Sequence, residues 1–244
     1  MMKSRKAPQR KAAGRSRATP LAGAADAPFA VPKLQRNTLN EEVYEQLKQA
    51  LMTGRIAPGA TMTIRSLAAS FGISPMPVRE ALRRLVAEHV LFLLPNRSVS
   101  MPVITRERFR EITRIRTSLE GLAAEEATPL IDSGTIDRIA ALNDEMERED
   151  AAKTADYLVK NRELHFSLYR ACQMPTLVKI IESLWLQIGP LLTIQQGIYV
   201  KAGITVQTHH RRLLKALRKR NAQEARVSIV DDIEDAAKLI ADAL

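Results

Sequence analysis

The sequence predicts a mainly α-helical protein with two folded segments and a single β-hairpin. Apolar residues recur every three or four positions through most of residues 37–244, which is the period of helices that pack through one face. The strand-like stretch lies between residues 90 and 103, where two apolar runs flank a Pro-Asn-Arg-Ser turn. A chain of 244 residues is long enough to form two such domains, each with a core of its own.

The net charge of +10 is concentrated near the N-terminus. Residues 1–36 carry nine Lys or Arg and one acid, Asp26, whereas residues 104–244 carry 21 side chains of each sign. Because residues 1–36 are rich in Ala, Pro, Arg and Lys and show no apolar period, we expect a disordered basic tail. Such an arm adds salt-dependent attraction to DNA phosphates; the alternatives are a solubilising extension and a mitochondrial transit peptide.

Cysteine content and hydropathy restrict the compartment. A lone cysteine, Cys172, excludes a disulfide framework and indicates a reducing environment. No apolar run approaches the roughly 20 residues that a membrane helix needs, and Asp26 and Pro28 interrupt the apolar stretch near the start. We therefore expect a cytoplasmic protein with no membrane partner.

Residues 37–103 show the pattern of three short helices followed by a hairpin. The first helix carries an apolar stripe, the second runs from about Thr63 to Phe71, and Gly72 supplies a left-handed turn after it. Ser74 is a good N-cap for the third helix, and Pro75 occupies the first helical position, where its missing N–H costs nothing. The stripe of the first helix consists of Leu39, Val43, Leu47 and Leu51.

The third helix has an apolar face and a basic face. Val78, Leu82 and Leu85 fall on the first, and Arg79, Arg83 and Arg84 on the second. This arrangement suits insertion into a DNA major groove, while Arg97 at the hairpin tip is placed to reach a phosphate or the minor groove. Each arginine by itself can also be a solvated surface charge. Together, the elements predict that residues 37–103 form a winged helix-turn-helix DNA-binding domain.

Residues 104–244 predict an antiparallel bundle of about six helices. The later helices are expected at about 154–172, 175–197, 200–220 and 222–243, after one that ends near Ile131 and one that includes residues 136–146. Four polar residues fall in phase with apolar ones, namely Asn161, His165, His210 and Asp232. Two interpretations are open: a hydrogen-bonded buried histidine pair, or a site for a divalent ion such as Zn, Ni or Mn.

The N-terminal motifs resemble those of GntR-type bacterial transcription regulators. The resemblance rests on the run Gly54-Arg55-Ile56-Ala57-Pro58-Gly59 and on the block Pro77-Val78-Arg79-Glu80-Ala81-Leu82. It implies that Arg79 and Arg65 contact DNA. Pro75 and Met76 stand where the family often places Arg and Thr, so two polar DNA contacts are absent.

The C-terminal motifs resemble the FCD ligand-binding domain of FadR-type GntR regulators. They are Asn161-Arg162-Glu163-Leu164-His165-Phe166 and the run from His210 to Leu217. The resemblance implies a divalent metal held by Asn161, His165, His210 and Asp232, with Asp232 in the place of a third family histidine. It also implies that a small carboxylate binds at Arg116. Arg is well shaped for that purpose, although a partnership with Glu120 one helical turn away is the alternative.

These features lead us to expect a metabolite-responsive transcriptional regulator, a repressor that binds a pseudo-palindromic DNA operator as a homodimer. Two alternatives remain. A metal-dependent enzyme built on the helical bundle is disfavoured because the chain has no HExxH, no pair of Glu-x-x-His motifs and no Gly-rich phosphate loop. An effector-blind dimeric DNA-binding protein would use the bundle for dimerisation alone.

Overall fold

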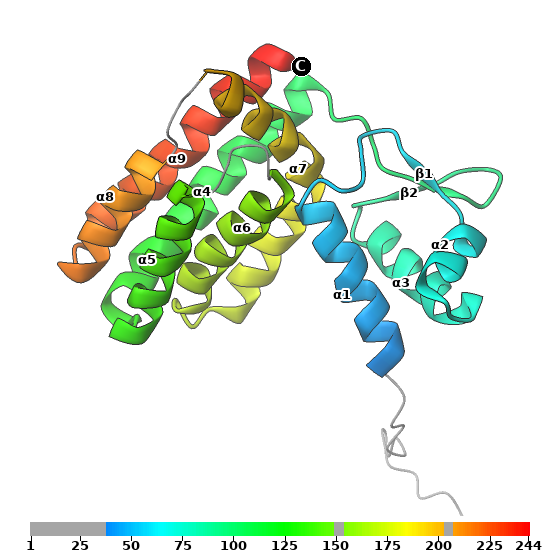
Figure 1. Ribbon diagram of the computed structural model, residues 1–244, viewed down its shortest axis with the longest axis horizontal. Helices are drawn as coiled ribbons and strands as arrows, with labels where there is room; N and C mark the ends of the chain where they lie inside the picture. The colour runs from blue at the N-terminus through cyan, green and yellow to red at the C-terminus, as the bar shows by residue number, and fades with distance from the viewer. Residues whose placement is uncertain (1–37, 149–153, 203–206) are drawn as a thin grey trace, which may run out of the picture. The chain divides into compact units, whose positions relative to one another are not determined.

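The computed structural model describes residues 38–148, 154–202 and 207–244. Within them, the protein has nine helices and one small antiparallel sheet, as predicted (Figure 1). The basic tail expected at residues 1–36 lies outside the described residues. None of the helices that the structure describes is long and apolar enough to cross a membrane.

The N-terminal elements form a winged helix-turn-helix. They are α1 (Thr38–Met52), β1 (Thr61–Met62), α2 (Ile64–Phe71), α3 (Pro75–Ala87), β2 (Phe92–Leu93) and β3 (Val99–Ser100). The sheet has the order β1-β3-β2, and both pairs are antiparallel. The sequence predicted the β2–β3 hairpin but not β1, because a two-residue strand is too short to show an alternating pattern.

Caps and turns fix the angle between α2 and α3. Thr63 and Ser66 form a reciprocal capping box at the start of α2. Gly72 ends that helix with a φ of 67°, a conformation that glycine adopts without a steric cost. Ser74 occupies the N-cap position of α3, as predicted, but its side chain makes no capping hydrogen bond there.

Apolar side chains from α1 and α3 make the core of this domain. Leu47, Leu51, Leu82 and Leu85 are each at most 3% exposed. Leu39, the first residue of the predicted stripe, is instead 43% exposed because it lies in the first turn of α1, beyond the reach of α3. The buried faces hold α3 in place and leave its arginine-bearing face outward.

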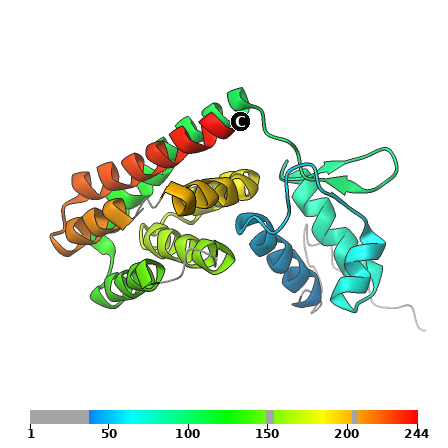
Figure 2. The same ribbon diagram turned by 45° about the horizontal axis from the view of Figure 1, so that its top comes forward.

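The C-terminal elements form an all-helical bundle. They are α4 (Arg106–Leu130), α5 (Ser133–Arg148), α6 (Thr154–Arg170), α7 (Pro175–Ala202), α8 (Gln207–Arg218) and α9 (Ala222–Ala243). α9 packs along α4 and beside α8, and α5 packs beside α6 and α8 (Figures 1 and 2). Trp185, Tyr169 and Phe166 are almost fully buried at its centre.

Two details of the bundle differ from the prediction. α7 continues through Gly197 to Ala202, whereas the sequence placed a helix end at Gly197. A glycine inside a helix costs only about 1 kcal/mol relative to alanine, so it weakens the helix without ending it. Ile115 follows the helical period of Phe109 and Ile112, which predicts that it is buried with them; in the structure it is 39% exposed.

The end of α1 lies directly against α7. A Cβ atom added to Gly189 would come within 2.1 Å of the carbonyl oxygen of Leu51, and one added to Gly54 within 2.2 Å of the Thr193 side chain. Close by, the buried Lys48 ammonium pairs with Glu182 at 2.8 Å. The two helices therefore approach each other at backbone distance.

Candidate functional site

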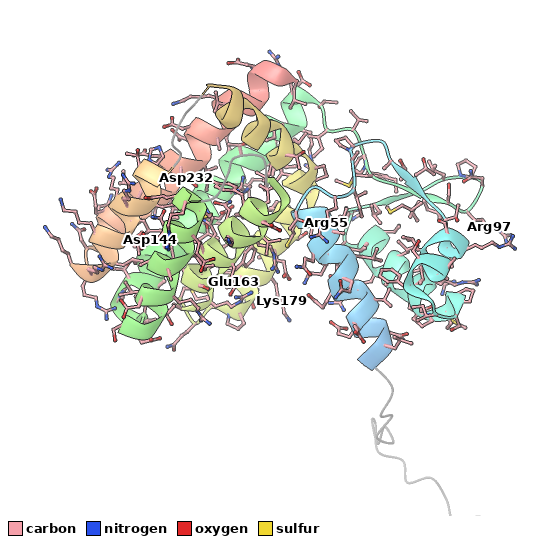
Figure 3. The ribbon with its side chains drawn as sticks, viewed as in Figure 1. Arg55, Arg97, Asp144, Glu163, Lys179 and Asp232 are labelled. Atoms are coloured by element: carbon pink, nitrogen blue, oxygen red, sulfur yellow. The ribbon has the colours of Figure 1, made fainter. Side chains whose placement is uncertain are left out.

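The arginines predicted to contact DNA lie on the winged helix-turn-helix surface. Arg65 on α2, Arg79 on α3 and Arg97 in the turn between β2 and β3 are exposed. Arg97 has a φ of 62° and projects from the end of the hairpin (Figure 3). Arg83 is also exposed and pairs with Glu80, one turn earlier, at 3.2 Å. All four guanidinium groups are therefore placed where a DNA backbone or groove can reach them.

Arg84 is also exposed, but contacts with α1 and with Glu88 engage its guanidinium. Its guanidinium carbon lies 3.6 Å from the centre of the Tyr44 ring, and the group pairs with Glu41 and Glu88 at 3.1 Å. The Tyr44 hydroxyl donates to Glu88 at 2.7 Å, and burial, followed by this acid, raises the pKa of Tyr44. Arg84 thus ties α3 to α1.

The bundle brings three of the four predicted metal-binding residues together. His165 on α6, His210 on α8 and Asp232 on α9 each offer a ligand atom, and these atoms lie within 4.8 Å of one another. Nε2 of His165 is 3.5 Å from the Asp232 carboxylate, and Nε2 of His210 is 4.0 Å from it. The rings of the two histidines are 5.3 Å apart.

Burial keeps both imidazoles in the neutral form. Desolvation lowers the pKa of His165 well below 6.5, assisted by the charges of His210 and Arg116. Desolvation also lowers the pKa of His210 and raises that of Asp232. Within the described part of the chain, neither ring nitrogen of His210 has a hydrogen-bond partner. A neutral imidazole with a bare nitrogen is the form that binds a metal ion.

A small cavity of about 30 Å³ opens beside this cluster. Arg116, Asn161, His165, Trp185 and Asp232 are among the residues that line it. Asn161, the fourth predicted ligand, therefore shares the cavity with His165 and Asp232. The volume is enough for an ion or a water molecule, but not for a larger metabolite.

Two known family profiles match this chain, one in each of its folded parts. The family profile of the FCD domain matches residues 111–235, and that of the bacterial regulatory proteins of the gntR family matches residues 39–100. The chain belongs to the GntR family. It is 33% identical to the HTH-type transcriptional regulator McbR of Escherichia coli over 162 residues, which cover 65% of this chain and 72% of that protein.

Other relatives agree with this assignment. The uncharacterized HTH-type transcriptional regulator YdhC of Bacillus subtilis is 25% identical over 197 residues, which cover 78% of this chain and 85% of that protein. The solved structure of E. coli McbR/YncC superimposes with a TM-score of 0.79 and 25% identity over 85% of this chain and 99% of that one. A GntR regulator from Rhodococcus sp. RHA1, at 20% identity, has the same fold with a TM-score of 0.68, covering 85% of this chain and all of that one.

The family membership gives the general activity. This GntR-family protein is a DNA-binding transcriptional regulator, and its family and named relatives are regulators rather than enzymes. The enzyme alternative raised by the sequence is thereby excluded.

Arg116 of this regulator is already engaged by a buried acid. Its Nε donates to Oε1 of Glu120 at 2.6 Å, and Nη2 lies 3.4 Å from Oε2. Glu120 is fully buried, and the indole of Trp185 donates to its Oε2 at 3.0 Å. The pairing with Glu120, raised from the sequence as the alternative role of Arg116, is the one that the structure contains.

The supporting residues around the cluster were not found from the sequence. Tyr169 donates its hydroxyl proton to Glu120 at 2.6 Å and lies 3.1 Å from Nδ1 of His165. Its position four residues after His165 was the available signal, because such residues share a helix face. His209, the neighbour of His210 in the sequence, hydrogen-bonds Asp235 at 3.0 Å.

Proposed function

We propose that this transcriptional regulator is a homodimeric repressor whose helical domain binds a divalent metal ion and a small carboxylate. The observation that carries the proposal is the buried group of His165, His210 and Asp232, with ligand atoms within 4.8 Å of one another. Two neutral imidazoles and a carboxylate suit Zn, Ni or Mn, and the amide oxygen of Asn161 is the candidate fourth ligand.

The chemistry of the residues fits a metal ion better than a self-contained hydrogen-bond network. Buried polar atoms are nearly always satisfied, yet no described residue hydrogen-bonds to either ring nitrogen of His210. An ion within about 2.1 Å of an imidazole nitrogen would satisfy one of them. When bound, the ion would supply a positive charge that attracts an acid into the cavity.

The proposed effector is a small organic acid bound at Arg116. The Arg116–Glu120 pair uses Nε and Nη2 of the guanidinium, which leaves Nη1 to hold a carboxylate in the cavity that Arg116 lines. Because the cavity is about 30 Å³, an acid larger than a few atoms requires the surrounding helices to separate. Such a separation would couple binding to a change in the bundle.

The outer face of α4 supports a two-fold dimer. A groove of about 640 Å³ follows this face, with Ile115 and Leu119 among its lining residues and 39% of Ile115 exposed. The charges beside them alternate in sign along the helix: Glu107, Arg110, Glu111 and Arg114. An isologous interface needs a self-complementary surface of this kind, and two DNA-binding heads related by a two-fold axis would read a pseudo-palindromic operator.

The proposed sign of regulation follows from this coupling. A dimer that fits its operator in the effector-free state occupies the promoter until an acid binds, and an acid that favours another arrangement of the heads releases it. An effector can shift operator affinity only by the ratio of its own affinities for the two states. Transcription from the target promoter in cells with and without the gene tests the sign directly.

Elemental analysis of the purified full chain tests the metal. We expect about one divalent ion per chain in the wild type, loss of the ion in His165→Ala, and full retention in His89→Ala, which replaces an exposed histidine of the other domain. Absence of metal from the wild type after incubation with Zn, Ni and Mn would reject the metal. An operator affinity unchanged by every acid tested would favour the effector-blind alternative.

A further inference from the structure

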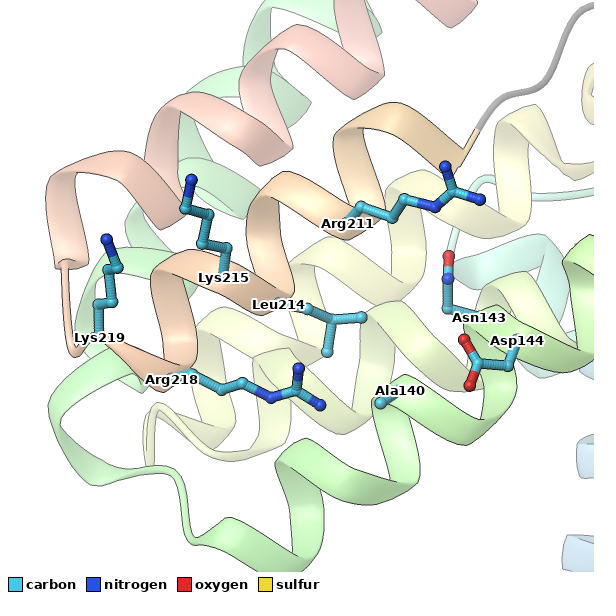
Figure 4. A pocket seen from close by; sticks show the side chains of 8 residues that line it. All are labelled: Ala140, Asn143, Asp144, Arg211, Leu214, Lys215, Arg218 and Lys219. Carbon is cyan, nitrogen blue, oxygen red and sulfur yellow. The ribbon is translucent and has the colours of Figure 1, made fainter.

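A second hollow lies between α5 and α8, away from the histidine cluster. Its volume is about 460 Å³, and it shares no lining residue with the cavity beside His165. Four basic side chains line it from α8 and the turn that follows, and residues of α5 face them across the hollow (Figure 4). They are Arg211, Lys215 and Arg218, which share one face of α8 because they are three, four or seven positions apart, and Lys219 in the turn.

Three of the four cations form no direct ion pair with an acid of the described residues. Lys215, Arg218 and Lys219 are exposed, and none makes an ion pair within the described part of the chain. Arg211 differs, because its guanidinium donates two hydrogen bonds, of 2.8 and 2.6 Å, to Glu147 of α5. That pair connects the two helices, while the other three cations remain available to an anion.

An unsatisfied acceptor lies among the residues that line the same hollow. Asn143 is 1% exposed and lines the hollow from α5, with its side chain directed toward α8 in Figure 4. Its Nδ2 donates to Glu147 at 2.8 Å, but its Oδ1 has no hydrogen-bond partner among the residues that the structure describes. A buried carbonyl without a partner is destabilising, and a hydroxyl group of a ligand would satisfy it.

We propose that this hollow binds a phosphorylated sugar or polyol. Lys215, Arg218 and Lys219 would hold the phosphate through charge-assisted hydrogen bonds. Asn143 Oδ1 and the Asp144 carboxylate, which also lines the hollow, would accept hydrogen bonds from hydroxyl groups of the carbon chain. A volume of about 460 Å³ lies within the range of small-molecule sites.

The alternative source of phosphate is a DNA backbone, and the observations favour the small molecule. A surface that follows DNA is predominantly cationic, because a carboxylate repels the neighbouring phosphates. Here Asp144 lines the hollow, and Glu147 lies beside it in contact with Arg211 and Asn143. A duplex also offers no flexible hydroxyl donor to reach the buried Asn143 oxygen.

Calorimetric titration of the full chain with glucose 6-phosphate, glucose and inorganic phosphate tests the site. We expect the wild type to bind glucose 6-phosphate more tightly than phosphate, and not to bind glucose. Lys215→Ala with Arg218→Ala should weaken glucose 6-phosphate binding by about tenfold or more. The matched control is Arg138→Ala with Lys179→Ala, which removes two exposed cations from α5 and α7 and should leave the affinity unchanged.

Asn143→Leu separates sugar recognition from phosphate attraction. It keeps the size of the side chain and removes the unsatisfied oxygen. Glucose 6-phosphate should therefore bind only as tightly as phosphate. A cooperative thermal denaturation curve confirms that the variant folds. Absence of glucose 6-phosphate binding by the wild type, or equal losses in the control pair, would overturn the proposal. So would a Lys215→Ala/Arg218→Ala variant that loses affinity for random-sequence duplex DNA while binding glucose 6-phosphate like the wild type.

Discussion

The hydroxyl oxygen of Tyr169 lies 3.1 Å from Nδ1 of His165. A phenol has one proton, and Tyr169 donates it to the Glu120 carboxylate at 2.6 Å, which can only accept. Tyr169 therefore accepts a hydrogen bond from the Nδ1–H of His165, and this fixes the neutral imidazole with its lone pair on Nε2, the nitrogen that faces Asp232.

Tyr169→Phe should weaken the proposed metal site without removing a ligand. The variant deletes the acceptor that holds the His165 tautomer, and loss of such an outer contact typically costs about 10–100-fold in metal affinity. Competition with a chromophoric zinc chelator measures the change. Tyr44→Phe replaces a buried tyrosine of α1 that does not line the cavity beside the cluster, and serves as the comparison. A zinc affinity equal to wild type in Tyr169→Phe would contradict the assigned tautomer.

The stability of the metal-free protein should decrease as the pH falls below neutrality. Burial lowers the pKa of His165 well below 6.5 and also lowers that of His210. Below about pH 6.5 the unfolded chain therefore binds protons that the folded protein does not, and protonation favours unfolding. We expect the melting temperature in EDTA to drop between about pH 7 and pH 5.5.

Variants of single histidines isolate this effect from other titrations. Burial raises the pKa of Asp232. The contribution of Asp232 to protein stability therefore decreases as the pH rises through the raised pKa, which is opposite to the effect of the two histidines. His165→Gln should flatten the decline in melting temperature toward acid pH. His89→Gln, at an exposed position, should keep the wild-type slope, and an equal slope in all three proteins would contradict the prediction.

Arg79→Ala and Arg97→Ala should weaken operator binding in different ways. Arg79 lies on the recognition helix, so its loss should cost about 1–3 kcal/mol and relax sequence preference if it contacts a base. Arg97 at the hairpin tip should contribute to phosphate binding, and its loss should reduce the slope of log K against log salt by about 1. Fluorescence anisotropy with operator and random duplexes distinguishes the two effects.

Arg84→Ala serves as the contrasting variant on the same helix. Because Arg84 stacks on Tyr44 and pairs with Glu41 and Glu88, its loss should lower the melting temperature. At a temperature where the variant is folded, the slope of log K for DNA binding against log salt should equal that of the wild type. A reduced slope would show that Arg84 also reaches DNA.

Ile115→Glu should convert the proposed dimer into a monomer. The change adds a charge to the exposed apolar part of the α4 face, where burial against a second copy would leave it unpaired. Analytical ultracentrifugation measures the mass, and Leu130→Glu, at another exposed apolar residue of α4, is the comparison. A dimeric Ile115→Glu protein would place the interface elsewhere.

The sequence predicted what periodic patterns and turn residues encode. The stripe of α1, the Gly72 turn and the apolar face of α3 are local signals, so the helix-turn-helix followed from them. The convergence of His165, His210 and Asp232 was also anticipated, because polar residues in phase with apolar ones must face the interior. Those predictions required only the direction in which a side chain leaves its own helix.

The remaining features depend on distances between helices, which no single segment encodes. Glu120 receives donors from α4, α6 and α7, and nothing in the sequence around it indicated that it is buried. The outward direction of Ile115 and the hollow beside Lys215 likewise depend on which helix packs against which face. The sequence pattern does not distinguish Arg84 from Arg79 and Arg83, because its contact with Tyr44 depends on how α1 packs against α3.

The glycines at the junction of α1 and α7 determine how movement can pass between the two domains. With Gly189 against the Leu51 carbonyl and Gly54 against Thr193, main chain touches main chain or a short side chain. Few side-chain rotamers at this junction can change to accommodate a displacement, unlike at an interface made of long side chains. A shift of α7 would therefore displace the end of α1 by a similar amount.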